Sequence, residues 1–170
     1  KVTDMNAMFD LTGVIEQLDV SNFDTSNVTD MKWMFFGLNK LKKLNLTNFD
    51  TSKVTNMYGM FDAMTDVSEI KFGTNFNTRN VTNMGRMFAY CDSLSELNLS
   101  NFNTSAVTAK SRMFEHCISL KTIYSSDTWK DFASDMFVGC TQLKGAVKFD
   151  AHKVGVDKTN RVVSATQTDM

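Results

Sequence analysis

The sequence predicts an α/β repeat protein, a right-handed solenoid of about six coils in which short helices alternate with the strands of a parallel sheet. Three observations predict this class. A string that begins with Asn-Phe recurs along the chain, and the dipeptide Met-Phe recurs at a nearly constant spacing. Within each unit, the spacing of apolar residues changes from that of a helix to that of a strand.

The repeated unit is about 26 residues long. The string NFDTSNVTDM and its variants stand at residues 22–31, 48–57, 75–84 and 101–110. Met-Phe pairs stand at residues 8–9, 34–35, 60–61, 87–88, 113–114 and 136–137, in steps of 26, 26, 27, 26 and 23. Columns of Val and of Leu or Ile run in phase with these pairs. We therefore expect an array of about six coils over residues 1–145 and a closing segment over residues 146–170.

The residues around each Met-Phe pair predict a short helix. Met31, Met34, Phe35 and Leu38 have the spacing i, i+3, i+4, i+7, which places them on one face of a helix. The third and fourth pairs repeat this spacing. A Thr shortly before each pattern suits an N-cap.

The segment after each helix predicts a strand. These segments are LKKLNL at 41–46, VSEIKF at 67–72 and LSELNL at 94–99, and their last four residues alternate apolar and polar side chains. This alternation is typical of a strand with one buried face. The Phe of each Asn-Phe string should fill the following turn, and the Asn should bond open backbone groups there. Such a unit falls within the length range of leucine-rich repeats, so the prediction is a leucine-rich-repeat-like solenoid.

Composition argues against several classes of function. The net charge of −1 gives no electrostatic reason to expect nucleic acid as a partner. No apolar run is long enough to insert into a membrane. The sequence lacks G-x-S-x-G, H-E-x-x-H and a phosphate-binding Gly loop, and its two His stand at 116 and 152. We therefore expect no enzyme, no cofactor and no metal centre.

Two groups of residues have alternative interpretations. Cys91, Cys117 and Cys140 fall in one column, where stacked coils would bring them within disulfide range, although buried free thiols suit parallel side chains better. Four convergent ligands for zinc are not available. Asp24 and Asp50 lie one coil apart, so they either bind Ca²⁺ or cap exposed turns.

The strings LDVSNFDTSNVTDMKWMF, LNLTNFDTSKVTNMYGMF and MFAYCDSLSELNLSNFNTS resemble the repeat of BspA-like leucine-rich-repeat surface proteins of Gram-positive bacteria. The resemblance covers roughly residues 2–145. It implies export, an extracellular location on the bacterial cell surface, and adhesion to host proteins, glycans or other cells. It implies that the signal peptide and the anchor lie outside this fragment, and it implies no catalytic residues.

Aromatic residues outside the predicted core are the candidate ligand-binding residues. They are Trp33, Phe36, Tyr58 and Tyr90, of which Trp33 and Tyr58 are the best placed. Rings on neighbouring coils suit a sugar face or an apolar side chain of a host protein. We therefore expect a non-catalytic adhesion domain that binds a host extracellular protein, a glycan or another cell-surface protein. The alternative is a passive spacer that displays another binding domain.

Two further expectations concern the surface. Thr25, Thr51, Thr78 and Thr104 form a column of the kind found on ice-binding solenoids, which makes ice or surface binding a third class to test. The first coil begins at Lys1 without a cap, so its apolar flank should be open to water.

Overall fold

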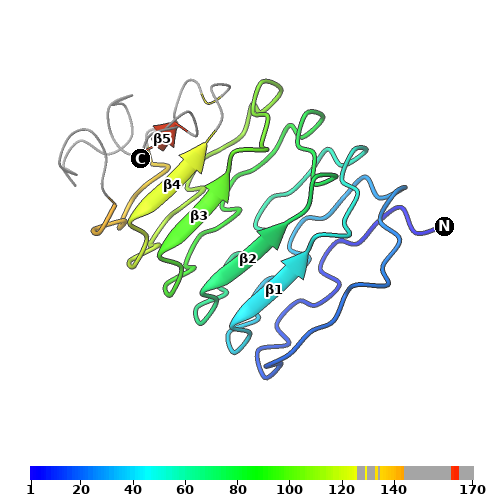
Figure 1. Ribbon diagram of the computed structural model, residues 1–170, viewed down its shortest axis with the longest axis horizontal. Helices are drawn as coiled ribbons and strands as arrows, with labels where there is room; N and C mark the ends of the chain where they lie inside the picture. The colour runs from blue at the N-terminus through cyan, green and yellow to red at the C-terminus, as the bar shows by residue number, and fades with distance from the viewer. Residues whose placement is uncertain (126–128, 130–132, 134, 144–161, 165–170) are drawn as a thin grey trace.

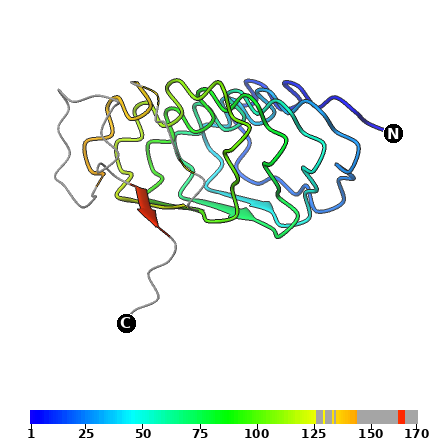
Figure 2. The same cartoon turned by 90° about the horizontal axis from the view of Figure 1, so that it is seen from above.

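The chain winds into a stack of coils, with short strands along one face and consecutive turns along the opposite face (Figures 1 and 2). The computed structural model describes residues 1–125, 129, 133, 135–143 and 162–164. The strands are β1 (Lys43–Leu46), β2 (Glu69–Phe72), β3 (Glu96–Leu99), β4 (Thr122–Ser125) and β5 (Val162–Ser164). They form two parallel sheets, β1-β2 and β3-β4-β5.

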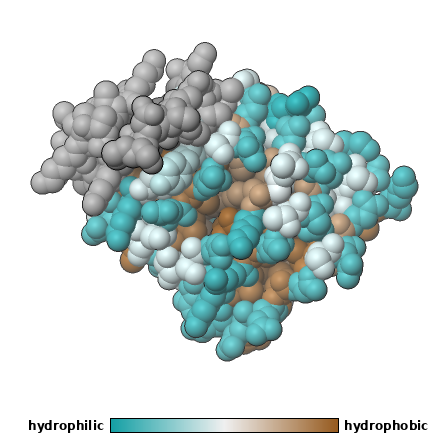
Figure 3. Space-filling view, in the orientation of Figure 1, coloured by the Kyte–Doolittle hydropathy of each residue, from teal (hydrophilic) through white to brown (hydrophobic). Residues whose placement is uncertain are grey.

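The predicted strands are confirmed. β1, β2 and β3 are the last four residues of the three predicted strand segments. Neighbouring strands pair one coil apart, so that Leu44 lies opposite Ile70 and Leu97 lies opposite Ile123. Polar side chains cover much of this sheet face, but hydrophobic surface is visible near its centre (Figure 3).

The predicted α/β class is wrong, because the described residues contain no helix. The segments predicted as helices each form two consecutive β-turns. We number the coils by their Met-Phe pairs, so the fourth coil contains the pair at 87–88. In this coil, the N–H of Met87 donates to the carbonyl of Met84 (3.2 Å), and the N–H of Cys91 donates to the carbonyl of Phe88 (3.4 Å). The third residue of each turn, Arg86 or Tyr90, has a positive φ, which a right-handed helix does not allow. The structure is therefore not a right-handed leucine-rich-repeat-like solenoid of helix–strand coils.

The spacing of apolar residues explains the error. The first and last residues of two adjoining four-residue turns stand at i, i+3, i+4 and i+7, the same spacing as one face of a helix. In the fourth coil these residues are all buried: Met84, Met87, Phe88 and Cys91. The pattern correctly identifies the buried residues, but it does not distinguish tandem turns from a helix.

The remaining backbone groups of the turns bond between coils. In the fourth coil, alternate N–H groups from Met84 to Tyr90 donate to carbonyls of the fifth coil, at 2.7–3.0 Å. In a helix, these N–H groups would instead donate to carbonyls of the same segment, four residues earlier. Each turn segment is therefore held by its neighbours in the stack, as a strand is held in a sheet.

The core contains a ladder of phenylalanine rings. The rings of the Met-Phe pairs stack from coil to coil with centroids 5.2–5.8 Å apart, and the ladder comprises Phe9, Phe35, Phe61, Phe88, Phe114 and Phe137. A second column is buried in the turns after the strands, as predicted, at Phe49, Phe76 and Phe102. The repeated Phe residues therefore hold successive coils in register through ring contacts.

The two ends of the array differ in what can be described. The first coil has an open apolar flank, as predicted: Leu11 is 73% exposed and Val14 is 87% exposed. At the other end, the predicted domain boundary at 145/146 lies outside the described residues. Of the predicted closing segment, residues 162–164 form β5, which pairs in parallel with β4.

Candidate functional site

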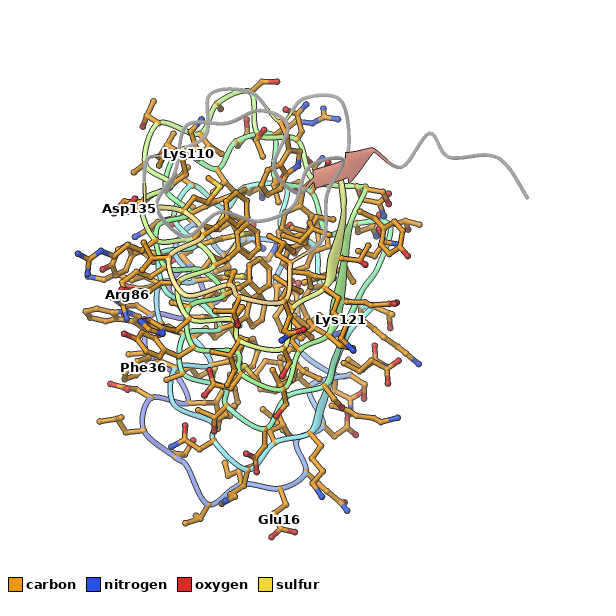
Figure 4. The ribbon with its side chains drawn as sticks, turned by 90° about the vertical axis from the view of Figure 1, so that its left-hand side faces the viewer. Glu16, Phe36, Arg86, Lys110, Lys121 and Asp135 are labelled. Atoms are coloured by element: carbon orange, nitrogen blue, oxygen red, sulfur yellow. The ribbon has the colours of Figure 1, made fainter. Side chains whose placement is uncertain are left out.

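The side chains in the middle of the turns form a surface on the opposite side of the molecule from the strands. We call this surface the turn face. Figure 4 shows Phe36 and Arg86 on it, with Lys121 beside the strands on the far side. Side chains from neighbouring coils lie next to one another here because successive turns are bonded in register.

An aromatic cluster occupies the turn face of the second and third coils. It comprises Lys32, Trp33, Phe36 and Tyr58. The Trp33 ring centroid lies 6.3 Å from that of Phe36 and 5.8 Å from that of Tyr58. Lys32 Nζ lies over the Trp33 ring at 4.1 Å and over the Tyr58 ring at 5.9 Å, so a cation–π contact joins the ammonium group to the cluster.

Glycines in the next coil make room for these rings. Trp33 and Gly59 occupy the same position in successive coils, and a Cβ atom on Gly59 would lie 2.4 Å from Trp33 Cδ1. Tyr58 and Gly85 are related in the same way, at 3.1 Å from Tyr58 Cδ2. The rings therefore lie along the stack, against the backbone of the next coil. They are half-buried as a result.

Tyr90 does not belong to the aromatic cluster. Its ring stacks on His116 of the fifth coil, with the centroids 5.0 Å apart. The guanidinium carbon of Arg86 lies 5.5 Å from the centroid of the Tyr90 ring. The structure thus brings three of the four predicted binding residues together and places Tyr90 in a separate ring pair.

An ionic ladder continues the turn face from the third coil to the sixth. It comprises Asp62, Arg86, Glu115, Arg112 and Asp135. Arg86 Nε lies 2.8 Å from Asp62 Oδ2, and Arg86 Nη1 lies 2.6 Å from Glu115 Oε2. Arg112 contacts Glu115 at 3.6 Å and Asp135 at 3.4 Å.

The Asp62–Arg86 pair is largely removed from water. Burial raises the pKa of Asp62, and the hydrogen bond from Arg86 opposes this shift without cancelling it. Burial also acts to lower the pKa of Arg86, but the Asp62 carboxylate, together with the charge of Glu115, outweighs it, so that the pKa of Arg86 is raised. The ladder therefore holds an arginine between two acids at a partly desolvated place on the turn face.

Repeat alignment is the signal that could have revealed the ladder. Asp62 and Glu115 occupy one column of the repeat, where the coil between them has the small residue Ala89. Arg86 stands three residues before Ala89, so its side chain can lie between the two acids. The contact of Lys32 with the rings could not be predicted from sequence, because a lysine beside an aromatic residue is usually solvated.

The three cysteines are free and buried. Each thiol donates to a carbonyl of the preceding coil: Cys91 to Phe61 (3.2 Å), Cys117 to Phe88 (3.0 Å) and Cys140 to Phe114 (2.8 Å). Burial raises the pKa of the Cys91 and Cys117 thiols, which disfavours the reactive thiolate. Free thiols, and not a disulfide, are thus the observed state.

Asp24 and Asp50 both cap turns. Asp24 Oδ1 accepts from the N–H of Ser26 (3.1 Å) and from its hydroxyl (2.6 Å). Asp50 Oδ1 accepts from the N–H of Ser52 (2.9 Å). Within the described part of the chain, no group of three or more His, Cys, Asp or Glu side chains is arranged to hold a metal ion.

Three of the four threonines in the column considered for ice binding are internal, and the fourth, Thr104, is half-buried. Thr25, Thr51 and Thr78 are at most 2% exposed. Thr51 Oγ1 donates to the carbonyl of Asn77 (2.8 Å) and accepts from the N–H of the same residue (2.7 Å). The hydroxyls of Thr25, Thr51 and Thr78 donate to carbonyls of the next coil, so these three residues offer no surface to ice.

The residues that the structure describes include no helix that is long and apolar enough to cross a membrane.

No curated protein and no solved structure matches the chain. The family described as "Mycoplasma protein of unknown function, DUF285" matches residues 1–72 and 45–149. These two matches together span the coils from Lys1 through the last Met-Phe pair. The chain therefore belongs to the DUF285 family.

Proposed function

We propose that this chain is a non-catalytic binding domain of a bacterial cell-surface protein, comparable in role to the BspA-like surface proteins whose repeat it resembles. Its partner is a host extracellular protein, a glycan or a surface protein of another cell. The protein is exported. The aromatic cluster contacts the partner.

The observation that supports this proposal most is the grouping of Trp33, Phe36 and Tyr58 with a lysine on one surface. Aromatic and cationic side chains contribute a large share of binding energy at protein interfaces. Rings can also pack against the apolar face of a sugar. The Lys32 ammonium adds a charge that steers and orients an anionic or polar partner.

One observation favours the alternative, a passive spacer. Trp33 and Tyr58 lie against glycines of the following coil, so their rings also join coils. In a spacer this contact would be their whole role, and the array would serve to hold another domain away from the cell.

The test begins with an array of extracellular-matrix proteins and glycans, followed by affinity measurements on the ligand found. We expect the double variant Trp33→Ala, Tyr58→Ala to bind at least tenfold more weakly, which corresponds to about 1.4 kcal/mol. The matched control is Tyr124→Ala, which removes an exposed ring from β4 on the opposite face. Because Trp33 and Tyr58 are half-buried, affinity must be measured well below the unfolding temperature, with folding checked by circular dichroism.

The two functions predict different results. A binding domain loses affinity in the double variant but not in the control. If the double variant is less stable and yet binds with unchanged affinity, the rings serve the stack, and the aromatic cluster is not the site.

A further inference from the structure

The third coil is one residue longer than its neighbours. Its Met-Phe pair at 60–61 is followed by the next pair 27 residues later, at 87–88, whereas the two preceding steps are 26 residues. One residue separates Leu46 from Asn48 after β1, and one residue likewise separates Leu99 from Asn101 after β3. After β2, two residues intervene, Gly73 and Thr74. The additional residue therefore lies immediately after β2.

The sheet is interrupted at the same place. β1 pairs with β2, and β3 pairs with β4, but β2 and β3 are not paired although they lie in successive coils. The longer corner is pressed against the preceding coil, because a Cβ atom on Gly73 would lie 2.1 Å from the carbonyl oxygen of Thr47. Only glycine fits this close approach of two backbones.

The interruption exposes apolar side chains whose counterparts in the two neighbouring coils are buried. The corresponding leucines of β1 and β3, at positions 44, 46, 97 and 99, are all buried. Ile70 and Phe72 of β2 are only half-buried. They open onto a cavity of about 280 Å³ between β2 and β3. Hydrophobic surface appears at this position in the middle of the sheet face (Figure 3).

The lining of the cavity defines the chemistry of a ligand. Ile70, Phe72 and Phe102 supply its apolar part, and the two phenyl rings meet edge to face, 5.2 Å apart. Asn98 and Asn101 supply amide groups at its rim. The charged side chain in the lining, Lys71, is already paired with Glu69 at 3.3 Å, a carboxylate that Lys43 shares at 3.1 Å, so the lining offers no charge without a partner and suits a neutral ligand.

We propose that this cavity is a binding site for a small neutral molecule with one aromatic ring and an adjoining amide or carbonyl group. The ring packs against the half-buried side chains of Ile70 and Phe72, and it meets the Phe72 ring in the offset or edge-on geometry that aromatic pairs prefer. The polar group exchanges hydrogen bonds with the rim amides, which both donate and accept. The volume suits one substituted ring, since a cavity of about 150 Å³ already holds benzene. This site is separate from the aromatic cluster and does not depend on the proposed adhesion function.

The experiment uses benzamide as the probe and follows the backbone amide signals of the whole chain by NMR. We expect saturable shifts at residues that line the cavity. Two relatives of the probe test the chemistry: acetamide lacks the ring, and benzoate carries a charge. Each should bind at least tenfold more weakly than benzamide.

Two variants test the location. Deleting Gly73 restores the 26-residue step and should allow β2 to pair with β3, which closes the cavity. Ile70→Lys keeps the longer corner and places a flexible charged chain at the cavity. Both should weaken benzamide binding at least tenfold, while the control Thr122→Lys, on β4 outside the cavity lining, should not change it.

Each of three outcomes would overturn the proposal. The unmodified chain shows no saturable shift, or acetamide or benzoate binds as well as benzamide, or a folded Ile70→Lys variant binds as well as the unmodified chain. Ligands found by the extracellular array should bind the folded Ile70→Lys variant normally, so failure here is distinguishable from failure of the adhesion proposal.

Discussion

Trp33 lies directly over Gly59, its counterpart in the next coil, so closely that the glycine could not carry even a methyl group without moving the indole ring. The same relationship joins Tyr58 to Gly85, with more space. A large ring in one coil is thus matched by a missing side chain in the next. The variable positions of the repeat are therefore not independent of one another.

Gly59→Ala should lower the free energy of unfolding by about 1–3 kcal/mol, because the new methyl group meets the Trp33 ring at a residue with φ of +58°. Urea denaturation measures this loss. The matched control is Gly85→Ala, where the ring of Tyr58 is further away and φ is not positive, so the loss should be smaller. Equal losses in the two variants would show that the close contact with Trp33 is not what limits position 59.

Thr51→Val should lower the free energy of unfolding by about 1–3 kcal/mol, because it leaves the N–H and carbonyl of Asn77 without their partner at a buried place. The control is Thr55→Val. Its hydroxyl donates to the carbonyl of Thr29 (3.2 Å) on an exposed part of the coil, where water can replace it. A loss at Thr51 no larger than that at Thr55 would contradict the inter-coil role of the buried column.

The pH dependence of stability should reveal Asp62. Its pKa is raised in the folded chain above the usual value of 3.8, so folding takes up a proton between the two pKa values. The contribution of Asp62 to the free energy of unfolding is therefore largest below the unfolded pKa, and it declines as the pH rises through the folded pKa. Asp62→Asn removes this dependence. Urea titrations of both proteins from about pH 3 to pH 7 should show the native chain losing stability relative to the variant as the pH rises. A relative gain over this range would mean that Arg86 dominates and lowers the pKa.

The first coil should open more readily than the third. The N–H groups of Ala7 and Phe9 donate to the second coil at 2.9 and 3.0 Å, much as those of Gly59 and Phe61 donate to the fourth coil, both at 2.9 Å. The first coil, however, has one flank in water. Amide hydrogen exchange at Ala7 and Phe9 should therefore be at least tenfold faster than at Gly59 and Phe61. Equal protection, in a sample shown to be monomeric by sedimentation, would refute this expectation.

Some features of the molecule could be predicted from sequence, and others could not, for identifiable reasons. The strands at 43–46, 69–72 and 96–99 were predictable because their alternation of side chains has a period of two residues. The helices were not, because helical spacing and tandem turns bury the same residues, and the choice depends on bonds between coils. The positive φ of non-glycine residues such as Trp33 and Arg86 could not be predicted from the residue type.

The candidate site was predictable to a similar extent. Trp33, Phe36 and Tyr58 could be assigned to the surface because they lie outside the repeated apolar columns, and the structure brings them together. The separate position of Tyr90 follows from its stacking on His116, a contact that depends on how the turns of successive coils are aligned. The cavity was signalled by the 27-residue step, but the consequence of one extra residue required knowledge of where the sheet breaks.

The direction of the backbone bonds on the turn face has an electrostatic consequence. Within each turn segment, the N–H groups that leave the coil point toward the next coil, and the carbonyls that receive them point back. Peptide dipoles, each of about 3.5 D, therefore add from coil to coil along this side of the stack. The strand side has no comparable sum, because the dipoles of extended chains alternate. The turn face consequently has a polarity like that of a helix but perpendicular to the run of the chain, with partial negative charge at the first coil and partial positive charge at the last.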